Sequence, residues 1–292
     1  MAFKKNIFDP NDSAPFKVSR SKIDLFLECP RCFYLDARLG VKRPSMPAFS
    51  LNSAVDTLLK NEFDALRKKG ESHELMKKYK IDAVPFSHPD LPLWRGEVNR
   101  FSGAKVLDEK SGLVVDGLVD DVWANKEGEL LIVDYKSTST TKEISLEDEY
   151  KQGYKIQMEI YQWIFRKLGF RVSDQGYFVF ANATKDRADF DGRLEFDMTI
   201  VGHKGDDSWV SGVLSKIKTC LLSKKIPDAG EACEHCAYRE KAGAAFRELV
   251  MSARQEAKSS VPDKGKAQEK TKKKSESENN QHSSGASTDK LF

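Results

Sequence analysis

The sequence lacks any long hydrophobic run. Across 292 residues, no segment approaches the roughly 20 consecutive apolar residues that a membrane-spanning helix needs. The first residues, MAFKKNIFDPND, also lack the apolar stretch of a secretory signal peptide. We therefore expect a cytoplasmic protein with no membrane partner, and its length allows one sizeable core.

Cysteine is scarce, and its number is odd. With five cysteines, a cytoplasmic chain is poorly suited to a disulfide framework. Four of them form two Cys-x-x-Cys pairs, Cys29 with Cys32 and Cys233 with Cys236, whereas Cys220 stands alone in an apolar helical pattern. Two such pairs are typical of a shared tetrahedral Zn²⁺. The alternative is that these four thiols bind nothing.

A strong excess of basic residues is missing as well. The formal net charge is +3, and the residues from Ala253 onward hold nine basic and six acidic side chains, which leaves 39 of each in the body. A nucleic-acid enzyme with a neutral body must concentrate positive potential in a local groove, take it from its tail, or depend on a partner.

The most informative stretch covers residues 113–136. Its two apolar, β-branched arms are separated by a turn at residues 125–128, which predicts a β-hairpin. Each arm carries an aspartate, Asp120 or Asp134, and Lys136 shares a strand face with Asp134. Because buried carboxylates are costly unless they are paired or hold a metal, these aspartates predict an oxygen site for a hard divalent cation. The alternative is a surface hairpin with solvated acids.

Three pieces of sequence resemble, in their order, the signature of the PD-(D/E)XK nuclease superfamily and its RecB-like and CRISPR-adaptation branches. They are Gly117-x-x-Asp120, Asp134-Tyr135-Lys136 and Gln157-x-x-x-Tyr161. The resemblance implies an α/β fold of the restriction-endonuclease type, with a mixed sheet flanked by helices. It also implies that the four cysteines clamp an N-terminal and a C-terminal helical region together.

The resemblance assigns roles to the site residues. Asp120, Asp134 and the backbone carbonyl of Tyr135 would hold Mg²⁺ or Mn²⁺, and Lys136 would position the attacking water. Gln157 and Tyr161 lie four residues apart on an expected helix, so they share one face and would orient the DNA strand. For Tyr161 the alternative is a half-buried core aromatic.

One position departs from the family pattern. Residues 49–68 predict an amphipathic helix whose apolar face includes Leu58, Leu59 and Phe63. In the family this helix often supplies a histidine to the metal, whereas Asp56 stands at that place here. Asp56 therefore has three interpretations: it is a third oxygen ligand of the metal, it replaces a lost histidine ligand and leaves the site impaired, or it is a solvated acid on the polar face of the helix. Glu97 resembles a further family acid upstream of the hairpin.

The cysteines match the family only in part. Residues 19–41, with a serine-started helix leading into Cys29-Pro30, resemble the N-terminal element of RecB-like nucleases. The iron–sulfur members use one N-terminal and three C-terminal cysteines, whereas this chain has two and two. The resemblance favours a [4Fe–4S] cluster and the spacing favours Zn²⁺, so the choice stays open.

The sequence divides into an irregular lead-in at residues 1–18, a nuclease domain at 19–251 and a disordered tail at 252–292. The tail ends in Asp289-Lys290-Leu291-Phe292, which resembles the short peptides that dock on a sliding clamp, with a chance match as the alternative. DNA, as single strands or duplex ends, is the expected partner, together with a helicase or a sliding clamp.

Two functions follow. The first is a metal-dependent deoxyribonuclease that hydrolyses phosphodiester bonds in DNA repair, recombination or defence. The second is a catalytically inactive nucleic-acid-binding or scaffolding module that keeps the fold.

Overall fold

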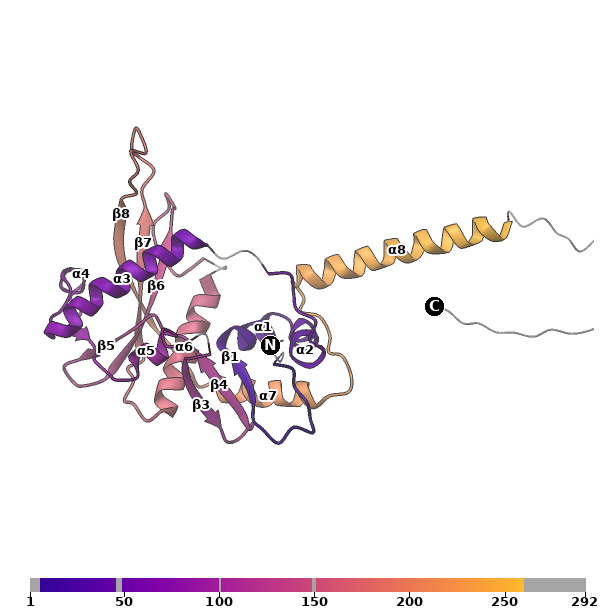
Figure 1. The fold of residues 1–292 in the computed structure, drawn as a ribbon, viewed down its shortest axis with the longest axis horizontal. Coiled ribbons are helices and arrows are strands. Elements are labelled where there is room, and N and C mark those ends of the chain that lie inside the picture. The colour runs from indigo at the N-terminus through magenta and orange to yellow at the C-terminus, as the bar shows by residue number, and fades with distance from the viewer. Residues whose placement is uncertain (1–5, 46–48, 100, 149–150, 260–292) are drawn as a thin grey trace, which may run out of the picture. The chain divides into compact units, whose positions relative to one another are not determined.

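The computed structural model of the protein describes residues 6–45, 49–99, 101–148 and 151–259 (Figure 1). Met1–Cys236 forms one compact unit, and a second unit begins at Ala237. Both sheets and all predicted site residues belong to the first unit. None of the helices within the described ranges has the length and apolar character to cross a bilayer.

Two mixed sheets form the framework of the first unit. The larger sheet has the order β2-β5-β6-β7-β8, and the smaller has the order β1-β4-β3. Strands β6 and β7 pair in parallel, as do β1 and β4, whereas the other neighbours pair antiparallel. The strands are β1 (Phe16–Ser19), β2 (Ala83–Pro85), β3 (Ala104–Asp108), β4 (Leu113–Gly117), β5 (Asp121–Asn125), β6 (Leu130–Thr138), β7 (Gln175–Ala183) and β8 (Phe196–Lys204).

Helices flank the sheets, so the predicted mixed α/β architecture is confirmed (Figure 1). Helix α6 contacts β3, β4 and β6, whereas α3 contacts β2 and β6, and α4 contacts β8. The described helices are α1 (Arg20–Glu28), α2 (Pro30–Leu39), α3 (Ser50–Lys69), α4 (Glu74–Lys78), α5 (Leu91–Trp94), α6 (Gln152–Lys167), α7 (Val210–Leu222) and α8 (Glu234–Ser259).

Strand β6 separates two hydrophobic cores. Leu130 and Ile132 belong to the core that includes α6, whereas Leu131, Val133 and Tyr135 belong to the core beneath α3 and α4. Successive side chains of a strand alternate between its faces, so Asp134 and Lys136 project on the α6 side. The alternation places the acid and the lysine of the motif opposite the helix that carries Gln157.

The predicted hairpin is correct in its turn but wrong in its first arm. Strands β5 and β6 pair across a turn in which Gly128 has φ of +73°, a value that favours glycine. Strand β4, however, belongs to the smaller sheet, and the chain changes sheets between Gly117 and Asp121. Asp120 therefore lies in this short crossing rather than within a strand.

Several boundaries also differ from the expectation. Phe16 and Val18 are buried in β1, inside the segment expected to be irregular, because β1 pairs with β4. Leu58 was expected on the inner face of α3 but is 67% exposed, since the helical period turns Leu59 and Phe63 toward the core instead. Helix α8 continues to Ser259, past the expected start of the tail. Leu291 and Phe292 lie outside the described residues.

A buried charge network fastens α3 and the loop after α5 to the sheet. Asp121, fully buried, accepts hydrogen bonds from Arg95 Nη2 at 2.8 Å and from the Tyr135 hydroxyl at 2.7 Å, and it also pairs with Arg67. Arg95 bonds Asp64 of α3 through both carboxylate oxygens. Because each buried charge has several partners, the network fixes the position of α3 relative to β5.

Candidate functional site

Asp134 is the centre of a connected polar group on the α6 side of β6. Its side chain is 1% exposed, one carboxylate oxygen accepts a hydrogen bond from Gln157 Nε2 at 2.6 Å, and the other pairs with Lys136 Nζ. Asp120 is joined to the same strand, because its Oδ2 accepts the backbone N–H of Tyr135 at 2.9 Å. The structure thus brings the two aspartates and the lysine of the motif together.

Helix α6 supplies the other two predicted residues. Gln157 accepts a hydrogen bond from Lys136 Nζ at 3.4 Å and donates through Nε2 to the Tyr161 hydroxyl at 3.2 Å. The Tyr161 ring is buried and lies so close to Gly117 that a Cβ there would stand 2.5 Å from it. Glycine at the start of the Gly-x-x-Asp motif therefore makes room for the tyrosine that ends the third motif.

Lys136 is also held from its apolar side. Its Nζ lies 4.5 Å from the centre of the Tyr154 ring, within the range of a cation–π contact. Together with Asp134 and Gln157, this ring fixes the direction of the ammonium group. Tyr154 was not singled out in the sequence, where an aromatic three residues before Gln157 reads as ordinary helix packing.

The structure places Asp56 and Glu97 differently from the other predicted residues. Asp56 pairs with Lys60 one helical turn later at 2.8 Å, and Lys60 Nζ lies 3.6 Å from Asp120 Oδ1. Asp56 is thus linked to the aspartate pair through a lysine that sequence reasoning missed. Glu97 lies 3.7 Å from Arg95 and is 46% exposed, beside the structural network around Asp121.

The geometry agrees with a family assignment. The model of the PD-(D/E)XK nuclease superfamily matches residues 17–241. The chain belongs to this superfamily. A solved structure titled "Crystal structure of SSO0001" is similar with a TM-score of 0.33 and 15% identity, over 76% of this chain and 81% of that chain. A search of curated proteins found no match.

The two predicted carboxylates, Asp120 and Asp134, lie close enough to repel each other. Burial, followed by the nearby charge of Asp134, raises the pKa of Asp120 to about 7, although Lys60 and the Tyr135 N–H act in the opposite direction. Burial also raises the pKa of Tyr161 to about 12, which keeps its hydroxyl protonated. A buried group of acid oxygens with excess negative charge suits a hard divalent cation, so the residues fit the metal that the superfamily uses.

The raised pKa of Asp120 predicts a pH-dependent stability. The folded protein binds the proton of Asp120 more tightly than the unfolded chain does, so ionisation of Asp120 destabilises the metal-free fold. This loss of stability is absent below about pH 4 and complete above about pH 7. Asp120→Asn is therefore expected to raise the melting temperature at about pH 8 and to leave it unchanged at about pH 4. Thermal unfolding without Mg²⁺ or Mn²⁺ measures this, and an equal change at both pH values would contradict it.

The four paired cysteines of the PD-(D/E)XK domain meet in a second site. Among the described residues, they are the one set of three or more metal-ligand side chains whose donor atoms all lie within 4.8 Å of one another. Cys32 Sγ lies 3.6 Å from the sulfurs of Cys233 and Cys236, and Cys29 Sγ lies 3.8 Å from that of Cys236. All four are buried. The predicted four-cysteine group is therefore present, whereas Cys220 packs against the main core.

Polar groups around Cys29 favour its thiolate form, whereas burial raises the pKa of Cys32 and of Cys236. Although burial acts against it, the N–H groups of Gly230 and Cys32 lower the pKa of Cys29 to about 6. Arg43 donates to Cys233 Sγ at 3.2 Å and is itself held by both carboxylate oxygens of Glu28. A Cβ at Gly230 would stand 2.0 Å from the Glu28 carbonyl oxygen, so this glycine permits the close approach of the two chain segments.

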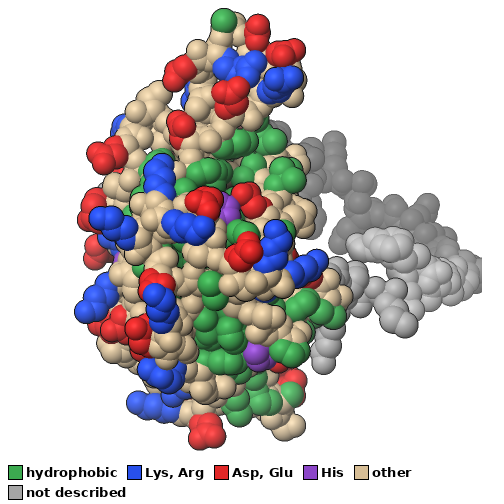
Figure 2. Space-filling model, turned by 90° about the vertical axis from the view of Figure 1, so that its left-hand side faces the viewer, with side chains coloured by type: hydrophobic (Ala, Val, Ile, Leu, Met, Phe, Trp, Pro, Cys, Tyr) green, Lys and Arg blue, Asp and Glu red, His purple; other side chains and the backbone are tan. Residues whose placement is uncertain are grey.

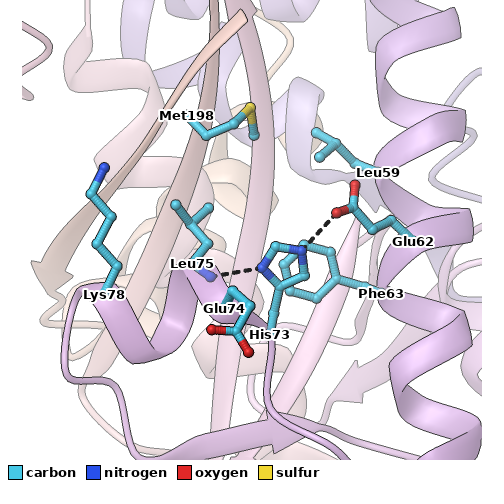
Figure 3. Close-up of a pocket in the computed structure, with 8 residues that line it drawn as sticks. All are labelled: Leu59, Glu62, Phe63, His73, Glu74, Leu75, Lys78 and Met198. Carbon is cyan, nitrogen blue, oxygen red and sulfur yellow. Dashed lines mark hydrogen bonds and ion pairs between the residues drawn. The ribbon is translucent and has the colours of Figure 1, made fainter.

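A cavity of about 430 Å³ lies elsewhere, between α3, α4 and β8 (Figure 3). Its wall is mainly apolar, and His73 crosses it with a hydrogen bond to Glu62 at 2.7 Å and a stacked contact on Phe63. The cavity contains none of the predicted site residues. Stacking on Phe63 leaves His73 half-buried.

Proposed function

We propose that the protein is a divalent-metal-dependent nuclease that hydrolyses DNA phosphodiester bonds, and that it belongs to the RecB-like and CRISPR-adaptation branch. The observation that carries this proposal is the single hydrogen-bonded group of Asp134, Lys136 and Gln157, with Asp120 attached to the same strand. A protein that used this fold for scaffolding alone would have no use for an oriented lysine paired with a buried acid.

Each residue has a defined part in this proposal. Asp120, Asp134 and the Tyr135 carbonyl would hold Mg²⁺ or Mn²⁺, which when bound lowers the pKa of a water and stabilises charge on the phosphate. Lys136 donates a hydrogen bond to the attacking water and holds it in line. Gln157 fixes the Asp134 carboxylate and donates to the Tyr161 hydroxyl, and the two residues together would orient the DNA strand.

The charge distribution bears on how DNA is held. On the face that Figure 2 shows, basic and acidic side chains are interspersed, in keeping with a net charge of +3 for the whole chain. We infer that binding depends on local contacts near the acid pair and on a partner that delivers DNA, such as a helicase or a sliding clamp. The proposed sites of action are DNA repair, recombination or defence, in the cytoplasm.

The inactive scaffold remains the second candidate, favoured by one observation. Asp56 stands where the family often has histidine, and it is paired with Lys60. Loss of a metal ligand is the expected route to an inactive member of the family. The buried arrangement around Asp134 argues for activity, so a direct assay separates the two.

The test is hydrolysis of single-stranded and duplex DNA with Mg²⁺ or Mn²⁺. Asp134→Asn keeps the shape of the side chain but removes its charge, so the rate should fall at least about 10³-fold if the carboxylate holds the metal. Asp82→Asn serves as the matched control, because Asp82 pairs with Lys126 and is largely exposed. Equal rates for wild type and Asp134→Asn, or no activity in any protein, would reject the nuclease.

We also propose that the four cysteines hold one Zn²⁺. Ligands at about 2.3 Å in a tetrahedron lie about 3.8 Å from one another, and the closest sulfur pairs here are 3.6 and 3.8 Å apart. A four-iron cluster would place iron and sulfide atoms between the thiolates and hold them further apart. Anaerobic purification should therefore give a colourless protein with one zinc; a brown iron protein would reject this assignment.

A further inference from the structure

Lys60 lies where the acid pair meets helix α3. Its Nζ is 2.8 Å from Asp56 Oδ2 and 3.6 Å from Asp120 Oδ1, and the side chain is only 16% exposed. The neighbouring residue, Leu59, lines the cavity of Figure 3. The ammonium group of this largely buried lysine thus lies within ion-pair distance of both Asp56 and Asp120.

The four oxygens of the aspartate pair each have a different hydrogen-bond or ion-pair partner. Asp134 is held by Gln157 and Lys136, and Asp120 by the backbone N–H of Tyr135 and by Lys60. Tyr135 N–H belongs to a strand that is paired on both sides and cannot withdraw. Lys136 is held by Gln157 and by the Tyr154 ring. Of these two partners of Asp120, Lys60 lies at the longer distance and is also paired with Asp56.

The second partner, Asp56, allows Lys60 to leave Asp120 and remain in an ion pair. A divalent cation bound to Asp120 and an ammonium group on the same carboxylate would repel each other strongly in this poorly solvated place. The ion pair with Asp56 lets the lysine leave Asp120 and still keep its charge neutralised, one turn away on its own helix. Asp56, which stands at the family's histidine position, would then bind the displaced Lys60.

We propose that Lys60 is an internal counter-ion: it neutralises Asp120 in the metal-free protein, moves to Asp56 alone when a divalent cation binds, and so sets the metal affinity of the site. The inference rests on the proposed nuclease function, since it concerns the same metal. It assigns Lys60 a positioning role toward the metal and leaves the hydrolytic step to the residues named above.

Calorimetric titration of the full chain with Mn²⁺ tests the inference without any assay of hydrolysis. Lys60→Met removes the competing charge and keeps the length of the stem, so Mn²⁺ should bind about tenfold more tightly than to the wild type. Lys60→Arg retains the charge and should bind as the wild type does. Lys69→Met removes an exposed charge from the last turn of the same helix and should also leave the affinity unchanged.

A second measurement is the melting temperature of the same proteins with and without Mn²⁺. Without metal, Lys60→Met should melt at a lower temperature than the wild type, because Asp120 loses its counter-ion, and Mn²⁺ should restore more stability than it gives the wild type. Lys60→Gln keeps a polar group for Asp56 and should show the same tighter binding if methionine prevents folding.

The outcomes separate the inference from the function on which it rests. Mn²⁺ binding that disappears in Asp134→Asn but is equal or weaker in both Lys60→Met and Lys60→Gln would overturn the counter-ion and leave the nuclease proposal intact. Weaker binding of DNA with unchanged Mn²⁺ affinity would also overturn it, because Lys60 would then be a phosphate contact. No Asp134-dependent Mn²⁺ binding in any variant would reject both proposals.

Discussion

Replacing Lys136 with methionine is expected to lower the rate of DNA hydrolysis by about 10²–10⁴-fold, the usual contribution of a positioned proton-handling group. Methionine keeps much of the apolar stem over the Tyr154 ring, so the fold should survive. It removes the ammonium group that pairs with Asp134 and reaches Gln157, and with it the donor that would hold the attacking water.

The measurement is single-turnover hydrolysis with Mg²⁺, together with Mn²⁺ titration of the same protein. Because the carboxylates remain, Mn²⁺ binding should persist while the rate collapses. Lys167→Met is a matched control, since Lys167 also lies over an aromatic ring, that of Trp163, at the far end of α6. A Lys136→Met protein that retains its rate would remove the lysine from the mechanism.

Replacing Cys233 with serine is expected to lower the melting temperature by about 10 °C or more, from the loss of about 4–5 kcal/mol of stability. The proposed metal would join Cys32 to Cys233 across about 200 residues, and the unfolded chain would regain the entropy of that long loop. Three buried thiols would also be left around an incomplete site. Cys29→Ser should have a similar effect, because both pairs contribute to one site.

Cys220→Ser is the control for this second prediction. Its thiol is half-buried and packs beside the main core, so serine should cost little there. Differential scanning calorimetry gives the melting temperature, and metal analysis of the same samples gives the zinc content. A Cys233→Ser protein with unchanged melting temperature would show that the thiols do not clamp the chain.

Those parts of the site that depend on local periodicity could be predicted from the sequence. Asp134 and Lys136 share a face because strand side chains alternate, and Gln157 and Tyr161 share one because four residues make about one helical turn. The turn at Gly128 follows from glycine's freedom at positive φ. None of these expectations needs contacts between residues distant in the sequence.

The rest depends on such distant contacts. Strand β4 pairs with Phe16–Ser19, nearly a hundred residues earlier, so nothing in residues 113–120 themselves reveals that the chain changes sheets before Asp120. Asp56 and Lys60 form a pair four residues apart, which is typical of a solvated helix face. Only the fold shows that Asp120 lies beside this pair and connects it to the candidate site. Asp121 directly follows Asp120, and nothing in the local sequence shows that it has a structural role. That role depends on its partners Arg67 and Arg95, which come from distant parts of the chain.

The position of the cysteines also orders events during synthesis. Cys29 and Cys32 leave the ribosome early, but Cys233 and Cys236 follow about 200 residues later, a delay of about 10–40 s at ordinary rates of translation. The ion cannot be enclosed before nearly the whole domain has been made. Loading of the proposed metal would therefore be the final step in maturation of the domain, and a chain cut short before Cys233 would leave Cys29 and Cys32 without their partners.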